Sequence, residues 1–213
     1  MPDLVLENQF LASGRGSVIG IDEAGRGPWA GPVTAAAFWL NPDHYDALPD
    51  DLDDSKKLSK SKRGRIYARL INSQHDFAVV SASSARVDEM GILKATFWAM
   101  QQAASQLQDR LRQRGLAVVG LCLVDGNLTP DLGMPAKAIV KGDMRSCSIA
   151  AASIIAKETR DAFMCDLAQE YPAYGWQTNM GYGTKDHVAA LAKHGVTRHH
   201  RRSFAPIKRL LDA

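Results

Sequence analysis

The chain has 213 residues, of which 46% are apolar and 23% are charged, and its formal net charge at pH 7 is +3. This length and composition suit about one globular domain with a small extension, and they exclude a largely disordered chain. No run approaches the roughly 18 to 20 apolar residues of a membrane-spanning helix, and the N-terminus, with Asp3 and Glu7, lacks the features of a secretory signal. We therefore expect a cytoplasmic protein without membrane contact.

The first half of the chain predicts three strands and one short helix. Residues 18–21 and 33–40 are apolar runs separated by a Gly- and Pro-rich stretch, which indicates adjacent strands joined by a special loop. A polar connection over residues 43–59 leads to a short helix at 62–72, and β-branched residues predict a third strand at 77–82. Only the two ends of the chain look loose.

The second half predicts longer elements. Apolar residues recur at three- and four-residue steps over 87–112, which is typical of one long amphipathic helix. Residues 116–124 form an unbroken apolar run, which indicates a strand buried on both faces, and residues 136–140 a further strand. A helix at 146–170 opens with small residues that allow close packing on a sheet. Shorter helices are predicted at 185–193 and 206–211.

This order of elements predicts an α/β fold with a mixed β-sheet flanked by helices and a helical C-terminal extension. We expect residues 1–170 to form the catalytic domain and residues 171–213 to pack on the same globule. Cys122, Cys147 and Cys165 show no metal-binding spacing and sit among apolar or small residues, so we interpret them as reduced core thiols. A monomer is the default expectation.

Acidic residues follow three of the predicted strands. Asp22 and Glu23 end the first, Asp125 ends the apolar run, and Asp143 comes just after the last strand, at the start of a helix. Strand ends in α/β sheets are where catalytic groups gather, and clustered carboxylates are stable mainly around a hard cation such as Mg²⁺ or Mn²⁺. The sequence therefore predicts a divalent metal site.

Each of these acidic residues also has a plainer interpretation. Asp125-Gly126 is a common turn dipeptide, and Asp143 before a helix could be an N-cap. Asp22 and Glu23 cannot both face one site from a regular strand, because neighbouring side chains point to opposite faces. We therefore expect the first strand to end or twist there, which Gly25 would allow.

The loop from Gly25 to Ala30 matches G-x-G-x-x-A, the dinucleotide-binding fingerprint, and follows a strand. Pro28 and Pro32 fit poorly with a helix beginning there, and the following residues resemble a strand. Asp22-Glu23 would also place negative charge beside a pyrophosphate. We therefore reject a nucleotide-cofactor enzyme, although tight NAD binding would revive it.

Positive charge gathers at the C-terminal end of the chain, where it forms a candidate phosphate-binding face. A solvated basic tail explains the same charges equally well. His199-His200 has no partners at metal-ligand spacing, and we expect it to face phosphates or to be exposed. The cluster comprises Lys193, Arg198, Arg201, Arg202, Lys208 and Arg209, with His194, His199 and His200 between them.

Several blocks in order resemble the ribonuclease HII family over nearly the whole chain. They are Gly20-Ile-Asp-Glu-Ala-Gly-Arg-Gly-Pro-Trp-Ala-Gly-Pro-Val33, Asp54-Ser-Lys-Lys-Leu-Ser59, Val124-Asp-Gly126, Lys141-Gly-Asp143, Ser148-Ile-Ala-Ala-Ala-Ser-Ile-Ile-Ala-Lys157, Tyr171-Pro-Ala-Tyr-Gly175, Gly181-Tyr-Gly-Thr184 and Arg202-Ser-Phe204. The ribonuclease HIII family usually carries an extra N-terminal domain and lacks Gly-Arg-Gly in the first block, so it fits less well.

The resemblance implies a ribonuclease H-like fold and an endoribonuclease that cuts the RNA strand of RNA–DNA hybrids and incises 5′ of ribonucleotides embedded in duplex DNA. It implies that a quartet of acidic residues binds the metal: Asp22, Glu23, Asp125 and Asp143. Phosphodiester hydrolysis with two Mg²⁺ or Mn²⁺ ions would leave 5′-phosphate and 3′-hydroxyl ends.

The resemblance also assigns substrate contacts. Gly25, Arg26 and Gly27 would present backbone groups to the 2′-hydroxyl at the cut, because glycine lets the main chain approach the sugar closely. Tyr182 would stack on the neighbouring deoxyribose and select an RNA-to-DNA junction. Two further contacts are implied: Ser55 and Lys56 would lie near backbone phosphates, and the C-terminal basic cluster would grip the duplex.

One residue departs from the family pattern, and one rival interpretation is left open. Met180 stands where the family commonly has lysine, which puts a nearby phosphate contact in doubt but not the chemistry. A replication clamp or a polymerase is a candidate partner by resemblance. A non-catalytic duplex-binding protein would explain the basic cluster, but it gives no reason for acidic residues at three strand ends.

Overall fold

A five-stranded mixed sheet in the order β3-β2-β1-β4-β5 lies at the centre of the computed structural model, which describes residues 1–116 and 119–212. Strand β1 pairs with β2 and β2 pairs with β3 in antiparallel orientation, whereas β1–β4 and β4–β5 are parallel pairs. The predicted mixed sheet is confirmed. Its strands are β1 Ser17–Ala24, β2 Val33–Trp39, β3 Asp76–Ala82, β4 Val119–Asp125 and β5 Ala136–Ile139.

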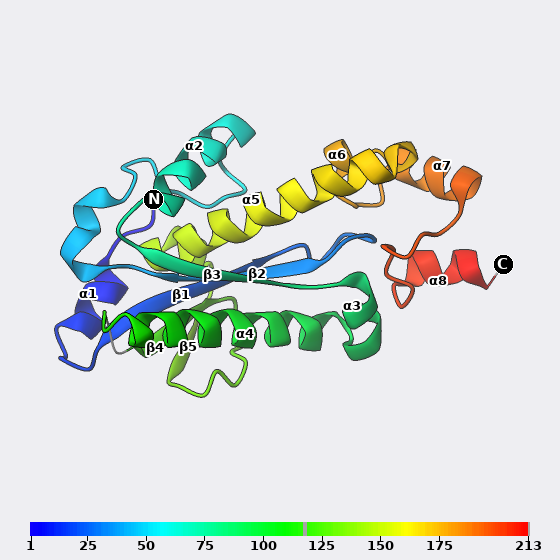
Figure 1. The fold of residues 1–213 in the computed structure, drawn as a ribbon. Coiled ribbons are helices and arrows are strands. Elements are labelled where there is room, and N and C mark those ends of the chain that lie inside the picture. The colour runs from blue at the N-terminus through cyan, green and yellow to red at the C-terminus, as the bar shows by residue number, and fades with distance from the viewer. Residues whose placement is uncertain (117–118, 213) are drawn as a thin grey trace.

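Helices cover both faces of the sheet. The long helix α4 packs on β1, β2 and β3 from one side, and α5 packs on β1 and β2 from the other (Figure 1). The helices are α1 Val5–Leu11, α2 Lys60–Ile71, α3 Ser84–Met90, α4 Ile92–Gln113, α5 Cys147–Glu170, α6 Trp176–Asn179, α7 Lys185–His194 and α8 Ala205–Leu211, with short 3₁₀ helices η1 Pro42–Ala47, η2 Gly142–Met144 and η3 Pro172–Tyr174.

The alternation of side chains along β1 sorts its residues between the two layers. Ile19 and Ile21 belong to the core that includes α4, so Gly20 between them faces α5. A Cβ atom at Gly20 would collide with the backbone of Ser148 and Ile149, which shows how closely α5 approaches the strand. The small residues at the start of α5 are fully buried, as their predicted packing on a sheet requires.

The predicted single helix over residues 87–112 is wrong, because the structure divides this stretch into α3 and α4. Gly91 separates them with φ 77° and ψ 152°, a conformation that a helix interior does not contain and that favours glycine. The apolar periodicity continues across the break, so the pattern alone did not reveal it. Ser83 caps the first of the two helices by accepting a hydrogen bond from the Arg86 N–H at 3.2 Å.

The N-terminus is ordered, contrary to expectation, and forms the short helix α1. Its Glu7 is only 1% exposed and lies at the N-terminal end of α5. The Glu7 carboxylate accepts hydrogen bonds from the Ser146 hydroxyl at 2.6 Å, the Ser148 hydroxyl at 2.8 Å and the Ser148 N–H at 3.0 Å. A helix of seven residues gives little periodic signal, and tertiary bonds of this kind hold it in place.

Strand β4 is less deeply buried than its apolar sequence suggests. Residues 119–121 are partly exposed, whereas residues 122–124 are buried, so burial on both faces holds only for the second part of the strand. Residues 117 and 118 of the predicted strand lie outside the described residues. Cys122 and Cys147 are buried thiols as expected, but Cys165 is partly exposed.

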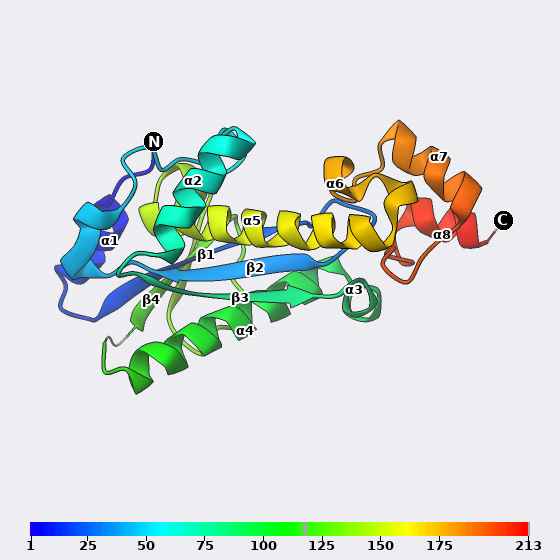
Figure 2. The ribbon, with the colours of Figure 1, turned by 45° about the horizontal axis from the view of Figure 1, so that its top comes forward.

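The last part of the chain packs around the C-terminal half of α5. Figure 2 shows α6 beside the C-terminal part of that helix, with α7 and α8 beyond its end. A separate core joins Met164 and Leu167 of α5 to Trp176, Leu191 and Ile207. The predicted helices at 185–193 and 206–211 correspond to α7 and α8. None of the described helices is both long and apolar enough to pass through a membrane.

Candidate metal centre and substrate cleft

Three acidic side chains meet at one edge of the sheet. Asp22 lies on β1, Asp125 is the last residue of β4, and Asp143 lies in η2 just before α5. One carboxylate oxygen from each residue lies within 4.8 Å of those of the other two. Asp22 and Asp143 are 3% and 5% exposed, so this group is largely withdrawn from water. The structure thus brings together three of the four predicted metal ligands.

Strand pairing and two backbone hydrogen bonds place these carboxylates. Because β1 and β4 are parallel and pair as far as Ile21 and Val124, the next residue of each strand, Asp22 and Asp125, lies beside the other. The Asp125 carboxylate accepts a hydrogen bond from the Gly142 N–H at 2.7 Å, which fixes it against the turn that carries Asp143. The Asp22 carboxylate accepts one from the Glu23 N–H, also at 2.7 Å.

Glu23 does not belong to this group of three. Strand β1 continues to Ala24 and stays paired with β2, so it does not end at Asp22 as one of the two expected alternatives required. Glu23 lines a small groove with Phe97 and Asp125 on the α4 side, and it also lines the larger cleft described below. Its carboxylate lies 3.5 Å from the guanidinium of Arg26.

The electrostatics of the site favour the binding of a cation. Burial, followed by the neighbouring charges of Glu23 and Asp125, raises the pKa of Asp22 well above its usual value. Burial and Asp125 raise the pKa of Asp143, and burial raises the pKa of Glu23 although Arg26 opposes this. Carboxylate oxygens at this spacing are ligands that Mg²⁺ and Mn²⁺ prefer. The donor set and its mutual repulsion therefore fit a divalent cation.

The loop before α2 brings the other predicted polar residues to this edge. The ammonium group of Lys56 lies 3.8 Å from the Asp143 carboxylate. Although partial burial opposes it, the charges of Asp22 and Asp143 raise the pKa of Lys56. The Ser55 hydroxyl is 2.7 Å from that of Ser153 on α5, so Ser55 is buried and fixed in place.

A cleft of about 370 Å³ opens beside the carboxylates. The loop between β1 and β2 forms one wall, and Tyr182, which is 50% exposed, forms part of the other. A Cβ atom on Gly27 would lie 3.4 Å from the Tyr182 ring, so the two walls nearly touch there. The cleft is lined by Glu23, Ala24, Gly25, Arg26, Gly27, Ser55, Lys56, Ser153, Lys157, Arg160 and Tyr182, which include all six predicted substrate contacts.

The loop at residues 25–32 contains no helix, so it lacks the helix N-terminus of a dinucleotide-binding loop. It is bonded instead to the C-terminal part of the chain. The Gly181 carbonyl accepts a hydrogen bond from the Trp29 N–H at 2.8 Å, and the His199 carbonyl accepts one from the Gly31 N–H at 2.9 Å. Segments that are far apart in sequence therefore build the cleft together.

Two members of the predicted C-terminal basic cluster are buried, which corrects their expected role. Arg201 is 0% exposed and His200 is 1% exposed, so neither can grip a duplex from the surface. The guanidinium of Arg201 contacts backbone carbonyls of the loop at residues 25–32. No sequence pattern distinguishes these two residues from their exposed basic neighbours, which are Lys193, Arg198, Arg202, Lys208 and Arg209.

His200 is part of a buried chain of hydrogen bonds that ends at Tyr182. The Trp176 indole N–H donates to Nε2 of His187 at 3.2 Å, which leaves the His187 Nδ1–H to donate to the Tyr182 carbonyl at 2.9 Å. The Thr197 N–H donates to Nδ1 of His200 at 3.0 Å, so His200 donates through Nε2 to His187 at 3.1 Å. Both rings are therefore neutral, and each has one defined tautomer.

This histidine pair predicts a pH dependence of stability. Burial lowers the pKa of His200 from 6.5 to about 4. Between these values the unfolded chain binds a proton that the folded chain does not, so the free energy of unfolding falls as the pH falls. We expect His200→Gln to remove a slope of up to about 1.4 kcal/mol per pH unit, measured by urea unfolding. The exposed His194→Gln is the control, and equal slopes in wild type and His200→Gln would contradict the prediction.

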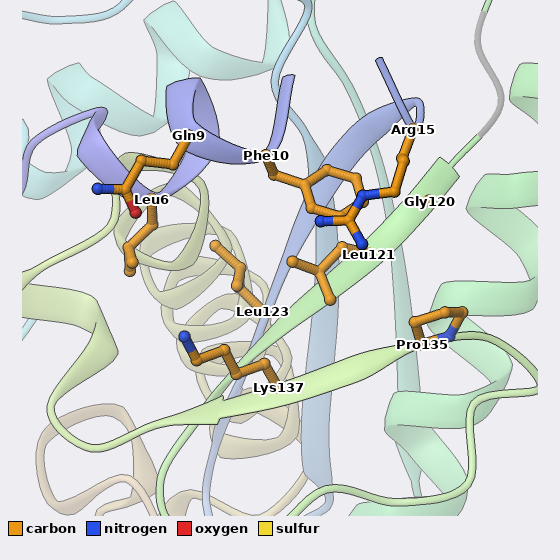
Figure 3. A pocket seen from close by; sticks show the side chains of 9 residues that line it. All are labelled: Leu6, Gln9, Phe10, Arg15, Gly120, Leu121, Leu123, Pro135 and Lys137. Atoms are coloured by element: carbon orange, nitrogen blue, oxygen red, sulfur yellow. The ribbon is translucent and has the colours of Figure 1, made fainter. Parts of the chain in front are cut away.

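A second cavity, of about 400 Å³, lies between α1 and the strands β4 and β5. Figure 3 shows Phe10 and Arg15 above Leu121, with Lys137 on the neighbouring strand. The guanidinium carbon of Arg15 lies 4.9 Å from the centre of the Phe10 ring. Its lining contains basic and apolar side chains and no carboxylate, so it does not resemble a metal site.

Comparisons with known proteins agree with this geometry. The Ribonuclease HII of Magnetococcus marinus is 50% identical over 214 residues, which cover 99% of this chain and 95% of that protein. The PCNA:RNase HII complex from Archaeoglobus fulgidus contains a chain that superimposes with a TM-score of 0.68 at 24% identity, covering 88% of this chain and 94% of that one. Bst-RNase HIII in complex with Mn²⁺ superimposes with a TM-score of 0.73 at 20% identity, covering 92% and 69%.

The two structural matches show the ribonuclease H-like fold, which was expected from the sequence. The sequence profile described as Ribonuclease HII matches residues 19–207, and this range contains all three carboxylates, the cleft and most of the C-terminal segment. Together with the identity to the Magnetococcus protein, this match establishes that the chain belongs to the ribonuclease HII family.

Proposed function

We propose that this protein is an endoribonuclease that cuts the RNA strand of RNA–DNA hybrids and incises on the 5′ side of ribonucleotides embedded in duplex DNA. As a family member it is a ribonuclease H, a phosphodiester hydrolase. One observation carries the finer proposal: the three carboxylates lie at the edge of a cleft whose walls are Gly25–Gly27 and Tyr182. A candidate metal site and a surface that could contact a ribose therefore lie next to each other.

In this proposal Asp22, Asp125 and Asp143 hold the cation, and Glu23 is the fourth ligand. Two observations support this role for Glu23: it lines the same cleft, and the charge of Asp125 contributes to raising its pKa. Two bound Mg²⁺ or Mn²⁺ ions would lower the pKa of the attacking water and would stabilise the negative charge that develops on the leaving 3′-oxygen. The products would carry 5′-phosphate and 3′-hydroxyl ends. The Mn²⁺ complex of the similar Bst-RNase HIII agrees with divalent metal use.

The remaining residues of the cleft bind and orient the substrate. The backbone of Gly25, Arg26 and Gly27 is accessible from the cleft and would contact the 2′-hydroxyl at the cut. Lys56 would attract a backbone phosphate, and Ser55 would lie beside it. Residues 1–170 would supply the chemistry and residues 171–213 part of the substrate surface.

We expect Tyr182→Ala to lower cleavage at a single embedded ribonucleotide by about 10-fold, because stacking on a nucleotide contributes roughly 1–3 kcal/mol. Cleavage of a long RNA–DNA hybrid should fall much less, since such a substrate has no RNA-to-DNA junction to select. Steady-state kinetics on both substrates measures the ratio. The control is Phe163→Ala, which removes an exposed aromatic ring from α5. Equal losses on the two substrates would exclude a junction-reading role for Tyr182.

The proposed reaction is tested with a labelled DNA duplex that contains one ribonucleotide and, in parallel, with an all-RNA strand in a hybrid. Each is incubated with the protein and Mg²⁺, Mn²⁺ or EDTA. Metal-dependent cutting 5′ of the ribonucleotide supports the whole proposal. If only the long hybrid is cut, the result agrees with the proposed metal centre but contradicts the proposed roles of Gly25–Gly27 and Tyr182. Binding without cleavage would favour a non-catalytic duplex-binding protein.

A sliding clamp is the proposed protein partner, because a similar chain is known in a PCNA:RNase HII complex. The protein itself is proposed to act as a monomer. Size-exclusion chromatography with light scattering, alone and with a purified clamp, tests both statements. A stable dimer without the clamp would contradict the second.

A further inference from the structure

Two arginines are buried beneath the loop at residues 25–32. Arg160 projects from α5 and is 1% exposed, and Arg201 follows α7 in sequence and is 0% exposed. Neither forms an ion pair with a carboxylate among the described residues. Burying a charged group without a counter-ion is costly unless its hydrogen bonds are satisfied, so their contacts require an explanation.

All the hydrogen bonds of these two side chains go to backbone carbonyls. Arg201 donates to the carbonyls of Gly25 at 2.6 Å, Arg26 at 2.9 Å and Gly31 at 3.0 Å. Arg160 donates to those of Pro32 at 2.9 Å, Ala30 at 3.2 Å and Met180 at 3.1 Å. Five of these six carbonyls belong to the loop, so the two guanidinium groups fix most of its peptide planes.

The orientation of the carbonyls sets the orientation of the amides. In a trans peptide the N–H points away from the C=O, and none of the peptide bonds among the described residues is cis. Because Arg201 binds the carbonyls of Gly25 and Arg26, the N–H groups of Arg26 and Gly27 point away from it. Within the described part of the chain neither N–H has an acceptor, and both residues line the cleft. Two unused donors therefore face the substrate side.

We propose that Arg160 and Arg201 are positioning residues that hold the Gly25–Gly27 backbone in the orientation that recognises a ribonucleotide. The inference rests on the proposed function, because the 2′-hydroxyl is the group to be recognised. Arg201 reaches two successive carbonyls with one planar group, which the ammonium group of lysine cannot reproduce. The role is therefore specific to arginine.

Asp88 of α3 fixes the backbone next to Arg201. Its carboxylate accepts hydrogen bonds from the Arg202 N–H at 2.8 Å, the Ser203 N–H at 2.8 Å and the Ser203 hydroxyl at 2.6 Å. Arg201 also donates its own N–H to the Trp29 carbonyl at 2.8 Å. Since Asp88 is only partly buried, its substitution offers a milder way to loosen Arg201 than a change in the core.

The test compares Arg201→Lys and Asp88→Asn with two matched controls. Arg112→Lys makes the same change at an exposed arginine on α4, and Glu89→Gln neutralises the exposed neighbour of Asp88. Hydrogen–deuterium exchange of the loop is measured without substrate, and Mn²⁺ binding is measured by calorimetry. The ratio of kcat/KM for a single embedded ribonucleotide to kcat/KM for a long hybrid gives the selectivity.

For Arg201→Lys we expect faster exchange in residues 25–31 and unchanged Mn²⁺ affinity. We also expect a selectivity lower by about 10- to 100-fold, because small displacements of groups that position a substrate cause losses of this size. Asp88→Asn should shift exchange and selectivity in the same direction by less, and the controls should match wild type. Unchanged loop exchange, or equal losses on both substrates, would overturn the proposal. If Arg201→Lys does not fold, the loop exchange and the selectivity of Asp88→Asn test the proposal instead.

The experiment also separates this inference from the proposed function. If the wild-type protein cuts neither substrate, the proposed function fails and recognition of a ribonucleotide fails with it. The exchange measurement uses no substrate, so it still decides whether Arg201 fixes the loop.

Discussion

Replacing Asp22 by Asn is expected to reduce cleavage by about 1000-fold or more, because a bound cation contributes several kcal/mol of transition-state stabilisation. Asp22 is the most deeply buried of the three carboxylates that meet at the sheet edge. The amide of asparagine would keep the shape of the side chain but would lose the charge that binds the cation. Calorimetry with Mn²⁺ should show much weaker binding, and turnover is measured on a long hybrid.

The same variant should unfold at a higher temperature than wild type when EDTA is present. Burial and neighbouring charges raise the pKa of Asp22, so the ionised carboxylate is unfavourable in the folded, metal-free protein. Asparagine relieves this repulsion, and thermal unfolding followed by circular dichroism measures the gain. The exposed Asp166→Asn should change neither activity nor melting temperature. Activity close to wild type in Asp22→Asn would exclude Asp22 as a metal ligand.

Replacing Gly20 by Ala is expected to destabilise the fold by about 3 kcal/mol or more, because the added methyl group has no room. It would overlap the backbone of Ser148 and Ile149 at the start of α5. Backbone atoms cannot rotate away as a flexible side chain can, so strand β1 and helix α5 would have to separate. Urea unfolding measures the free-energy difference.

Gly64 in helix α2 provides a matched control for that experiment. A Cβ atom there meets no other atom within 4 Å, and alanine is more favourable than glycine inside a helix by roughly 0.5–1 kcal/mol. Gly64→Ala should therefore stabilise the protein, so the same chemical change has opposite signs at the two positions. Similar effects of both substitutions would contradict the close contact between β1 and α5.

Most of the fold follows from local patterns in the sequence. The apolar runs locate the strands to within a few residues, and small residues mark the close approach of α5 to the sheet. The break at Gly91 was missed because one glycine does not interrupt the apolar period. Helix α1 was missed because its stability comes from the contacts of Glu7 with α5, and no local pattern encodes such distant contacts.

The candidate site was predictable where function depends on strand ends. Asp22 and Asp125 come directly after the last paired residues of β1 and β4, Asp143 follows β5, and parallel pairing brings such residues together. The position of Glu23 depends on whether β1 continues past Asp22, which is decided by its pairing with β2 and not by its own sequence. The burial of Arg201 likewise depends on a loop about 170 residues earlier in the chain, as its 2.9 Å bond to the Arg26 carbonyl shows.

The bonds between the loop at residues 25–32 and the C-terminal segment have a consequence for synthesis on the ribosome. The chain emerges N-terminus first, so Asp22, Asp125 and Asp143 can meet before Arg201 has been translated. The carbonyls of Gly25 and Arg26 receive their partner only when Arg201 leaves the exit tunnel. A nascent chain can therefore gather its three acidic side chains before the carbonyls of Gly25 and Arg26 are bound. If the loop has the proposed role, selectivity would be acquired after the metal centre has formed.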